Sequence, residues 1–239
     1  MMKVTILGTN GGYVSAGEAN SSILIENNDD RVIIDMGSGV LSNLERVCSL
    51  DKINNVVITH AHSDHFSDAL VAVYGRLISK QLKREVQDLV FHGPDDSLLK
   101  EKLKLENVSS YSVIDEDTVL NIGSLKLTFY KTIHGVTCYA VKCEVDGKSV
   151  FYTSDTSYSE KLIKEAKGCD LLLCECSILK KYGSGSRIGH MNTAECAAFI
   201  KETKASKVRL VHLPCYLHYS IIENECGYEC AKSLEEIIL

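Results

Sequence analysis

The residues of this chain that are best suited to chemistry lie in the stretch T-H-A-H-S-D-H, at positions 59–65. Three histidines and one aspartate fall within six positions, directly after the apolar run V-V-I. Neutral imidazole and carboxylate groups are the usual protein ligands of zinc and similar divalent ions. A solvated loop does not need such a cluster and a core would be destabilised by it, so the stretch predicts a metal site.

The spacing within this stretch suits two ions. His60 and His62 are two residues apart, so an extended backbone points both side chains the same way. Asp64 and His65 follow at the point where the chain turns towards a helix. One ion can take the first pair and a neighbouring ion the second. Because four ligands are too few for two ions, we expect further donors at other strand ends.

Three further candidate ligands stand at the ends of predicted strands. His134 follows L-T-F-Y-K-T-I, Asp155 follows V-F-Y-T-S, and His212 lies near the end of V-R-L-V-H-L, before a proline. Open α/β sheets place their binding sites at such strand ends. A single residue of this kind is more often an ordinary core or surface residue, but three of them together with the dense stretch indicate one centre.

The elements around these residues are those of an α/β protein in a single domain, residues 1–239. Asp146-Gly147 between two apolar runs predicts a hairpin. Periodicity predicts a helix over about 67–84 whose apolar positions are Leu70, Val73, Leu77 and Ile78. The other predicted strands include 4–8, 22–26, 31–35, 55–59, 88–94, 170–176 and 207–213, and the other predicted helices are 40–48, 158–167, 193–204 and about 220–238.

Composition narrows the class of partner. The chain has 26 basic and 32 acidic residues, a net charge of −6, which argues against affinity built on general nucleic-acid electrostatics. No apolar run approaches the length of a membrane span, and M-M-K-V-T-I-L-G enters a strand without a signal segment. We therefore expect a cytoplasmic protein with no membrane partner and no strong nucleic-acid binding.

The ten cysteines are consistent with the reducing environment of the cytoplasm, where thiols stay free. Several lie inside apolar strands, where free cysteine is a small buried hydrophobe: Cys138, Cys143, Cys174 and Cys176. We interpret the C-E-C of 174–176 as core packing, with a redox or metal role as the lesser alternative. Cys226 and Cys230, four residues apart on the predicted last helix, should share a buried face.

On these motifs the chain resembles the metallo-β-lactamase superfamily. T-H-A-H-S-D-H matches its H-x-H-x-D-H signature, and the later order of His134, Asp155 and His212 matches its remaining ligand motifs. The stretches L-G-T-N-G-G, I-D-M-G-S-G and F-H-G-P look like the branch of RNase Z and related phosphodiesterases. The resemblance covers nearly the whole chain. It implies an αββα sandwich, two mixed sheets flanked by helices, with a dinuclear site at one edge.

Carried over by position, the resemblance assigns the ligands of two divalent ions, zinc first, with manganese or iron as alternatives. One ion takes His60, His62 and His134, the other takes Asp64, His65 and His212, and both share Asp155. Iron-based oxygen and nitric-oxide reductases of the superfamily carry Glu where this chain has His62, so a redox role is disfavoured. Glu175 and Asp35 are expected to support ligands rather than to ligate.

The segment G-H-M-N-T-A-E at 189–195 has two compatible interpretations. In the structural one, Asn192 caps a helix and Glu195 closes a capping box, which leaves His190 as a loop residue. In the functional one, which we favour, His190 reaches the substrate, because the RNase Z-like branch has a similar segment whose histidine contacts the scissile phosphate. Arg187, in the glycine-containing loop before it, is a weaker candidate for phosphate contact.

The resemblance implies a phosphodiesterase in which two ions activate a hydroxide nucleophile, Asp64 helps to orient it, and protonated His190 stabilises the charged phosphoryl group or protonates the leaving alkoxide. RNase Z proteins usually carry a long basic arm before the bridging aspartate, whereas His134 and Asp155 here are separated by one predicted hairpin. A small phosphodiester, such as a cyclic phosphate or short nucleotide, therefore fits better than tRNA.

Alternative functions within the superfamily are thioester or lactone hydrolysis, RNase Z-type RNA cleavage, and a non-catalytic metal-binding role. A homodimer is the expected assembly, since relatives are often dimers. His92 and His218 have no place in this scheme; we expect His92 at a strand end near the site and His218 in packing, with Tyr216 and His218 as weaker candidates for lining the pocket.

Overall fold

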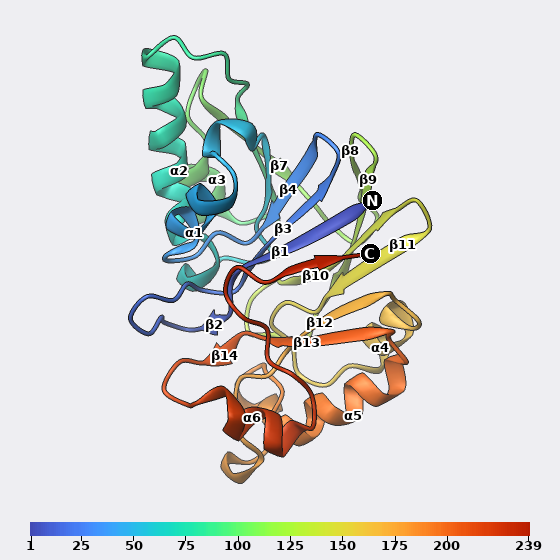
Figure 1. The fold of residues 1–239 in the computed structure, drawn as a ribbon. Coiled ribbons are helices and arrows are strands. Elements are labelled where there is room, and N and C mark those ends of the chain that lie inside the picture. The colour runs from blue at the N-terminus through green and yellow to red at the C-terminus, as the bar shows by residue number, and fades with distance from the viewer.

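Two mixed β-sheets lie face to face, and helices cover the outer face of each (Figure 1). The structure is a computed structural model that describes residues 1–239. The first sheet has seven strands in the order β15 (Glu236–Ile238), β1 (Met2–Gly8), β3 (Ser22–Asn27), β4 (Asp30–Ile34), β5 (Asn55–Val57), β6 (Leu89–Gly93) and β7 (Ser109–Val113). The strands from β15 to β4 pair antiparallel, and those from β4 to β7 pair parallel.

The second sheet has six strands in the order β13 (Lys207–Val211), β12 (Leu171–Glu175), β11 (Lys148–Tyr152), β10 (Tyr139–Val145), β9 (Leu125–Lys131) and β8 (Val119–Ile122). A short parallel pair joins β2 (Asn10–Gly11) to β14 (Leu213–Pro214). The pairing makes β9, β11, β12 and β13 run in one direction, so that their carboxyl ends share one edge of the sheet.

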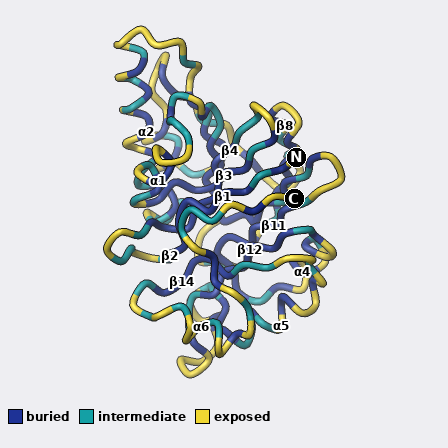
Figure 2. The backbone as a smooth tube through the Cα atoms, viewed as in Figure 1, coloured by how far each residue is buried: buried dark blue, intermediate teal, exposed yellow.

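Three apolar clusters bind the layers together. One lies between the two sheets, one between the first sheet and helices α1 (Val40–Val47), α2 (Ser63–Gln81) and α3 (Ser97–Leu103), and one between the second sheet and helices α4 (Glu160–Ala166), α5 (Thr193–Thr203) and α6 (Tyr219–Cys226). Figure 2 shows that the central strands β1, β3 and β12 are buried over most of their length. The predicted αββα sandwich is confirmed, as is the hairpin β10–β11 around Asp146-Gly147, and β3 and β4 form a second hairpin.

The predicted last helix over 220–238 is wrong beyond its first two turns. Helix α6 ends at Cys226 because Gly227 takes the left-handed conformation, with φ 84°, that commonly stops a helix. The chain then returns to the first sheet, where β15 pairs antiparallel with β1. Cys226 and Cys230 are both buried, but they do not share a helix face, because Cys230 lies in the segment after the helix.

Helix α2 begins earlier than predicted, at Ser63, and its buried face matches the prediction only in part. Val73 is buried and Leu77 packs against the core as predicted, whereas Leu70 and Ile78 are 40% and 42% exposed, and Ala69, Ala72 and Arg76 are buried. Small side chains let the helix approach its neighbours closely, and the Arg76 guanidinium donates hydrogen bonds to three carbonyl oxygens, those of Leu50, Ile53 and Gln87. The apolar periodicity of the helix could not reveal a buried arginine that pairs with distant backbone.

Replacing Arg76 by leucine should destabilise the fold by about 3 kcal/mol, because buried carbonyl groups that lose their partner cost roughly 1–3 kcal/mol each. Urea unfolding measures the free energy change. Arg84→Leu is the matched control, since the Arg84 side chain is exposed and pairs only with Asp51 at the surface. Equal stability of the two variants would contradict a structural role for Arg76.

None of the helices combines the length and the apolarity that crossing a membrane requires.

Candidate metal centre

Seven histidine and aspartate side chains meet at the edge where strands of both sheets end. They come from the loop after β5, the first turn of α2, and the residues after β9, β11 and β13: His60, His62, Asp64, His65, His134, Asp155 and His212. The fold therefore brings the seven predicted ligand residues together from five places in the chain. Helix α2 begins inside the motif itself, at Ser63, with Asp64 in its first turn.

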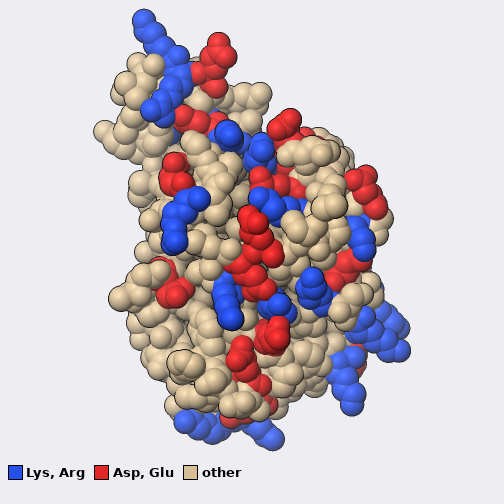
Figure 3. All heavy atoms as spheres, viewed as in Figure 1, with Lys and Arg blue, Asp and Glu red and all other residues tan.

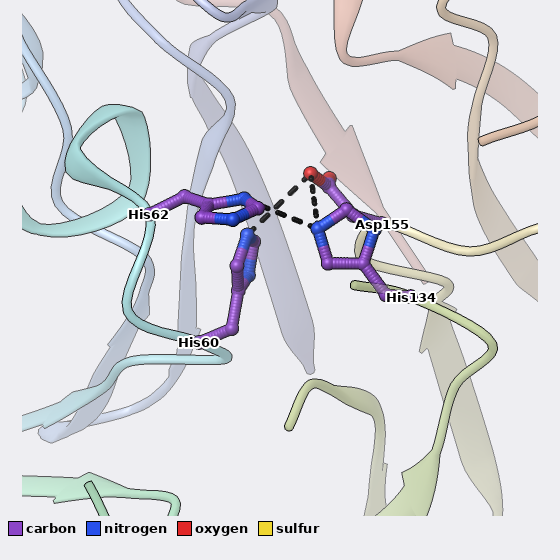
Figure 4. A group of neighbouring side chains, drawn as sticks. All are labelled: His60, His62, His134 and Asp155. Carbon is purple, nitrogen blue, oxygen red and sulfur yellow. Dashed lines mark hydrogen bonds and ion pairs between the residues drawn. The ribbon is translucent and has the colours of Figure 1, made fainter. Parts of the chain in front are cut away.

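Four of these side chains point towards one another in Figure 4. The Nε2 atom of His60 lies 3.5 Å from Asp155 Oδ2, and that of His134 lies 3.8 Å from the same oxygen. His134 Nε2 is also 3.1 Å from His62 Nδ1. The three imidazoles and one carboxylate oxygen thus surround one point, the arrangement expected for the first ion.

The other oxygen of Asp155 faces a second group. Its Oδ1 is 3.4 Å from His65 Nε2 and 3.3 Å from His212 Nε2. Asp64 Oδ2 lies 3.5 Å and 3.3 Å from the same two nitrogens. One carboxylate therefore divides its oxygens between two ligand clusters, which is what a residue shared by two ions requires.

Hydrogen bonds at the far side of three imidazoles select the tautomer that a metal needs. His65 Nδ1 donates to Asp35 Oδ2 at 2.7 Å, and His134 Nδ1 donates to the Gly189 carbonyl at 2.8 Å. The Ser177 hydroxyl donates to Glu175 at 2.6 Å, so it accepts the proton of His212 Nδ1 at 2.8 Å. In each case the lone pair is left on Nε2, which faces the cluster.

Three buried atoms at the centre have no hydrogen-bond partner in the protein: His60 Nε2, His65 Nε2 and Asp155 Oδ1. Burial holds the pKa of His60 well below its usual range, so its imidazole is neutral, which is the ligating form. Buried polar atoms without partners are costly. Divalent ions would satisfy all three at once, so the donor set fits the metals that the sequence predicts.

Strained backbone occurs at three positions beside or within the ligand set. Asp35, Ser154 and His212 all have positive φ, at 62°, 50° and 51°, a conformation that residues other than glycine rarely adopt. Each follows a strand whose end supplies the site. Such strain persists where the surrounding structure enforces it, typically at functional sites.

Two glycines of the predicted motifs are explained by close approach. A Cβ atom on Gly11 would lie 2.4 Å from the His212 ring, and one on Gly37 would lie 1.7 Å from the Asp64 carbonyl oxygen. Only glycine at these positions therefore lets the loop of 7–12 lie against the His212 ring and the loop of 34–39 lie against the backbone of Asp64. The neighbouring backbone N–H of Gly12 donates to Asp64 Oδ2 at 2.8 Å and orients that carboxylate.

Asp35 supports the site as predicted, through a buried network. Besides His65 it accepts hydrogen bonds from the backbone N–H of Thr59 at 2.8 Å, from the Thr59 hydroxyl at 2.9 Å and from the Tyr152 hydroxyl at 3.2 Å. Sequence reasoning missed Thr59, Tyr152 and Ser177, because a lone hydroxyl at a strand end carries no spacing signal. The only available clue was their position beside predicted ligands.

His190 lies beside the second cluster. Its Nδ1 is 3.1 Å from Glu175 Oε1 and 3.3 Å from the Ser177 hydroxyl, and its ring stacks on that of His212 with centroids 5.2 Å apart. Burial alone would lower the pKa of His190, but the Glu175 carboxylate raises it to about 9, with help from Asp155 and Asp64.

The capping interpretation of this segment also holds. The Asn192 side chain accepts from the backbone N–H of Ala194 and Glu195, and the Glu195 carboxylate accepts from the backbone N–H of Asn192, which completes a capping box at the start of α5. The cap fixes the loop that carries His190. The two interpretations are therefore compatible in the structure.

A cavity of about 230 Å³ opens beside His190 and His212. Its other lining residues are Gly11, Gly12, Tyr13, Ser177, Ile178, Ile188, Pro214 and Tyr216. Arg187 is exposed in a short turn (Gly185–Arg187) and is not among them. The structure thus gives no support to a phosphate contact by Arg187, because its neighbour Ile188 is the residue that reaches the cavity.

Tyr216 lines the cavity as suggested, but both expectations for His218, packing and the weaker alternative of lining this cavity, are wrong. His218 is exposed and caps α6, where its Nδ1 accepts from the backbone N–H of Ser220. His92 is buried within β6, where its Nε2 is 3.0 Å from Asn55 Oδ1, and burial lowers its pKa to about 4. Neither histidine belongs to the ligand clusters.

The chain matches a family model described as anti-Pycsar protein Apyc1 over residues 2–218. It belongs to the Apyc1 family. The probable metallo-hydrolase YhfI of Bacillus subtilis is 34% identical over 224 residues, 93% of this chain and 90% of that protein. The anti-Pycsar protein Apyc1 of Bacillus phage 010DV004 is 25% identical over 233 residues, 88% of each chain.

Solved structures confirm the fold. The crystal structure of YhfI, a metallo-β-lactamase fold protein, matches with a TM-score of 0.94 at 32% identity and covers 99% of this chain and 98% of that one. The short form of human tRNase Z shares the fold, with a TM-score of 0.78 at 18% identity over 99% of this chain and 98% of its own. This Apyc1 family member is thus a probable metallo-hydrolase with a metallo-β-lactamase fold and a His/Asp metal site.

Proposed function

We propose that this protein is a phosphodiesterase that depends on two divalent ions, zinc foremost, and cleaves a small phosphodiester such as a cyclic phosphate or short nucleotide. The observation that carries the proposal is the placement of His190, paired with Glu175 and stacked on His212, beside the ligand clusters. The ligands would be divided as predicted: His60, His62 and His134 on one ion, Asp64, His65 and His212 on the other, and Asp155 on both.

When bound, such ions lower the pKa of a water molecule and neutralise the charge of a phosphoryl group. The protein's own groups do the positioning. Asp64 is held by the N–H of Gly12, and its carboxylate can accept a hydrogen bond from the attacking water and so direct it. The strained and hydrogen-bonded backbone around the ligands keeps them in place before substrate arrives.

His190 would act on the phosphoryl group. Its Nδ1 is occupied by Glu175 and Ser177, so Nε2–H is the group left for the substrate. The neighbouring carboxylate favours the imidazolium form, which can stabilise negative charge on the phosphoryl oxygens or give its proton to the leaving alkoxide. A thioester or lactone develops less negative charge during hydrolysis than a phosphodiester, so such a hydrolase would depend less on this cation.

The cavity suits a small substrate with a ring. Tyr13 and Tyr216 are 63% and 60% exposed, and with Ile188 they offer apolar and aromatic surface in the cavity beside His190. Between His134 and Asp155 the chain forms only the β10–β11 hairpin, in place of an RNA-binding arm. On the face drawn in Figure 3, basic side chains are interspersed with acidic ones. These features favour a nucleotide-sized substrate over tRNA.

The test is hydrolysis of bis(p-nitrophenyl) phosphate beside a thioester, a lactone and a tRNA precursor. Protein stripped of metal should be inactive, and reloading with zinc or manganese should restore cleavage of the diester, after which cyclic nucleotides are assayed. Thioester or lactone turnover without diester cleavage would overturn the proposal. Absence of any turnover in the loaded protein would favour the non-catalytic alternative.

Tyr216→Ala should raise KM about tenfold for a cyclic nucleotide that the wild-type protein cleaves, with little change in kcat, because stacking on an aromatic side chain contributes about 1–3 kcal/mol per base. Steady-state kinetics measure the two parameters. Tyr74→Ala is the control, since Tyr74 is equally exposed but lies on α2 outside the cavity. An unchanged KM in the Tyr216 variant would show that no base stacks there.

A further inference from the structure

A second cluster of potential metal ligands lies behind strand β12, away from the His/Asp centre. Side chains alternate along a strand, so Glu175 points to the active site while Cys174 and Cys176 point to the opposite face. On that face they meet Cys196 of α5 and Cys226 at the end of α6. All four cysteines are buried within the apolar cluster between the second sheet and its helices.

Three of the sulfur atoms are close enough to share one ion, and the fourth lies beside one of them. The Sγ atoms of Cys176, Cys196 and Cys226 all lie within 4.8 Å of one another, and Cys174 Sγ lies 3.4 Å from Cys196 Sγ. Sulfur atoms 2.3 Å from a tetrahedral zinc are about 3.8 Å apart, which falls between these values. Rotation of the Cys174 side chain would have to bring the fourth sulfur towards the other three.

The cluster is shielded from solvent. Cys174, Cys176, Cys196 and Cys226 are each at most 4% exposed. The Cys196 thiol lies 3.3 Å from the Glu175 carbonyl oxygen, and the Cys174 thiol lies 3.6 Å from the same oxygen. Sulfur atoms from one strand and two helices thus converge at a place from which water is excluded.

We propose that Cys176, Cys196 and Cys226, with Cys174 as the fourth sulfur, hold a structural zinc ion that is separate from the catalytic centre. Four thiolates select thiophilic ions, and an all-sulfur site leaves no open position for chemistry. Binding would release the protons of the thiols to solvent. This inference does not depend on the substrate proposed above.

The position of the site gives it a role in the fold. It joins α5, α6 and the end of β12 at the residues that flank Glu175. Glu175 and the adjacent Ser177 hold His190 and His212 on the other face. A zinc ion at the cysteines would therefore fix the strand end from which the active-site contacts are made.

Cobalt substitution tests the site without any assay of turnover. The His/Asp centre offers only nitrogen and oxygen ligands, so a thiolate-to-cobalt charge-transfer band in the near ultraviolet would report the cysteine site alone. Wild-type protein loaded with cobalt should show this band and contain one metal equivalent more than Cys196→Ala or Cys226→Ala, which should lack the band. Cys143 is buried between the two sheets, away from the cluster, so the control variant Cys143→Ala should retain the thiolate band and the additional metal equivalent.

A wild-type protein without the thiolate band would overturn the proposal, whether or not it hydrolyses a diester. X-ray absorption of zinc-loaded wild-type protein keeps the test independent of how well the cysteine variants fold. Sulfur scatterers at about 2.3 Å from zinc support the site. A shell of nitrogen and oxygen alone would exclude it.

Discussion

Asp155→Ala should lower kcat/KM for bis(p-nitrophenyl) phosphate at least about 10³-fold and reduce the metal content of the His/Asp centre. The two oxygens of Asp155 face different clusters, 3.5 Å from His60 on one side and 3.3 Å from His212 on the other. Without this carboxylate the proposed centre would lose the anion that both ions would share, and with it the alignment on which two-metal catalysis depends. Kinetics and metal analysis of the same preparation measure both effects.

Asp95→Ala is the matched control for this variant. Asp95 is exposed and pairs with Lys100 at the surface, remote from the ligand clusters. It should keep wild-type activity and metal content. If Asp155→Ala retained a full complement of metal and normal turnover, the assignment of Asp155 as the shared ligand would be wrong.

His190→Ala should lower kcat for a phosphodiester about 10²–10⁴-fold while leaving the metal content unchanged, the range typical of a lost general acid. The reason is that Glu175 and Ser177 present the Nε2–H of His190 beside His212, where no other histidine outside the ligand set approaches the cavity. Steady-state kinetics with bis(p-nitrophenyl) phosphate give the change, and metal analysis shows whether the centre is intact.

Two further variants test whether the effect of His190→Ala arises from its loss as an acid. His218→Ala should have normal kinetics, since His218 is an exposed helix cap. Glu175→Gln should give a smaller loss than His190→Ala, because it weakens the charge on the imidazole without removing it. An unaffected diester rate in His190→Ala would return this residue to the role of a loop histidine before a helix cap and would favour the ester hydrolase alternatives.

The sequence by itself determined the parts that rest on local chemistry. Residues 60–65 carry four donors in one stretch, and His134, Asp155 and His212 stand at strand ends, so their meeting followed from the direction of the strands. The Asp146-Gly147 hairpin and the Asn192–Glu195 capping box were also readable, because each is specified within a few residues.

Tertiary structure decided what depends on partners far along the chain. Arg76 is buried because distant carbonyl groups accept its hydrogen bonds, and β15 forms because β1, at the other end of the chain, offers it an edge. The pattern of apolar residues within one segment cannot predict either of these distant partners. Gly227 was present in the sequence, but the left-handed conformation by which it ends α6 is evident only in the structure.

The cysteines illustrate the same limit. C-E-C at 174–176 was interpreted as core packing, and burial confirms that both thiols lie in the core. Their neighbours Cys196 and Cys226 come from two helices later in the chain, with spacings that match no compact metal motif. Proximity of four sulfur atoms arises from packing α5 and α6 on β12, since contact between distant segments is set by the fold and not by spacing in the sequence.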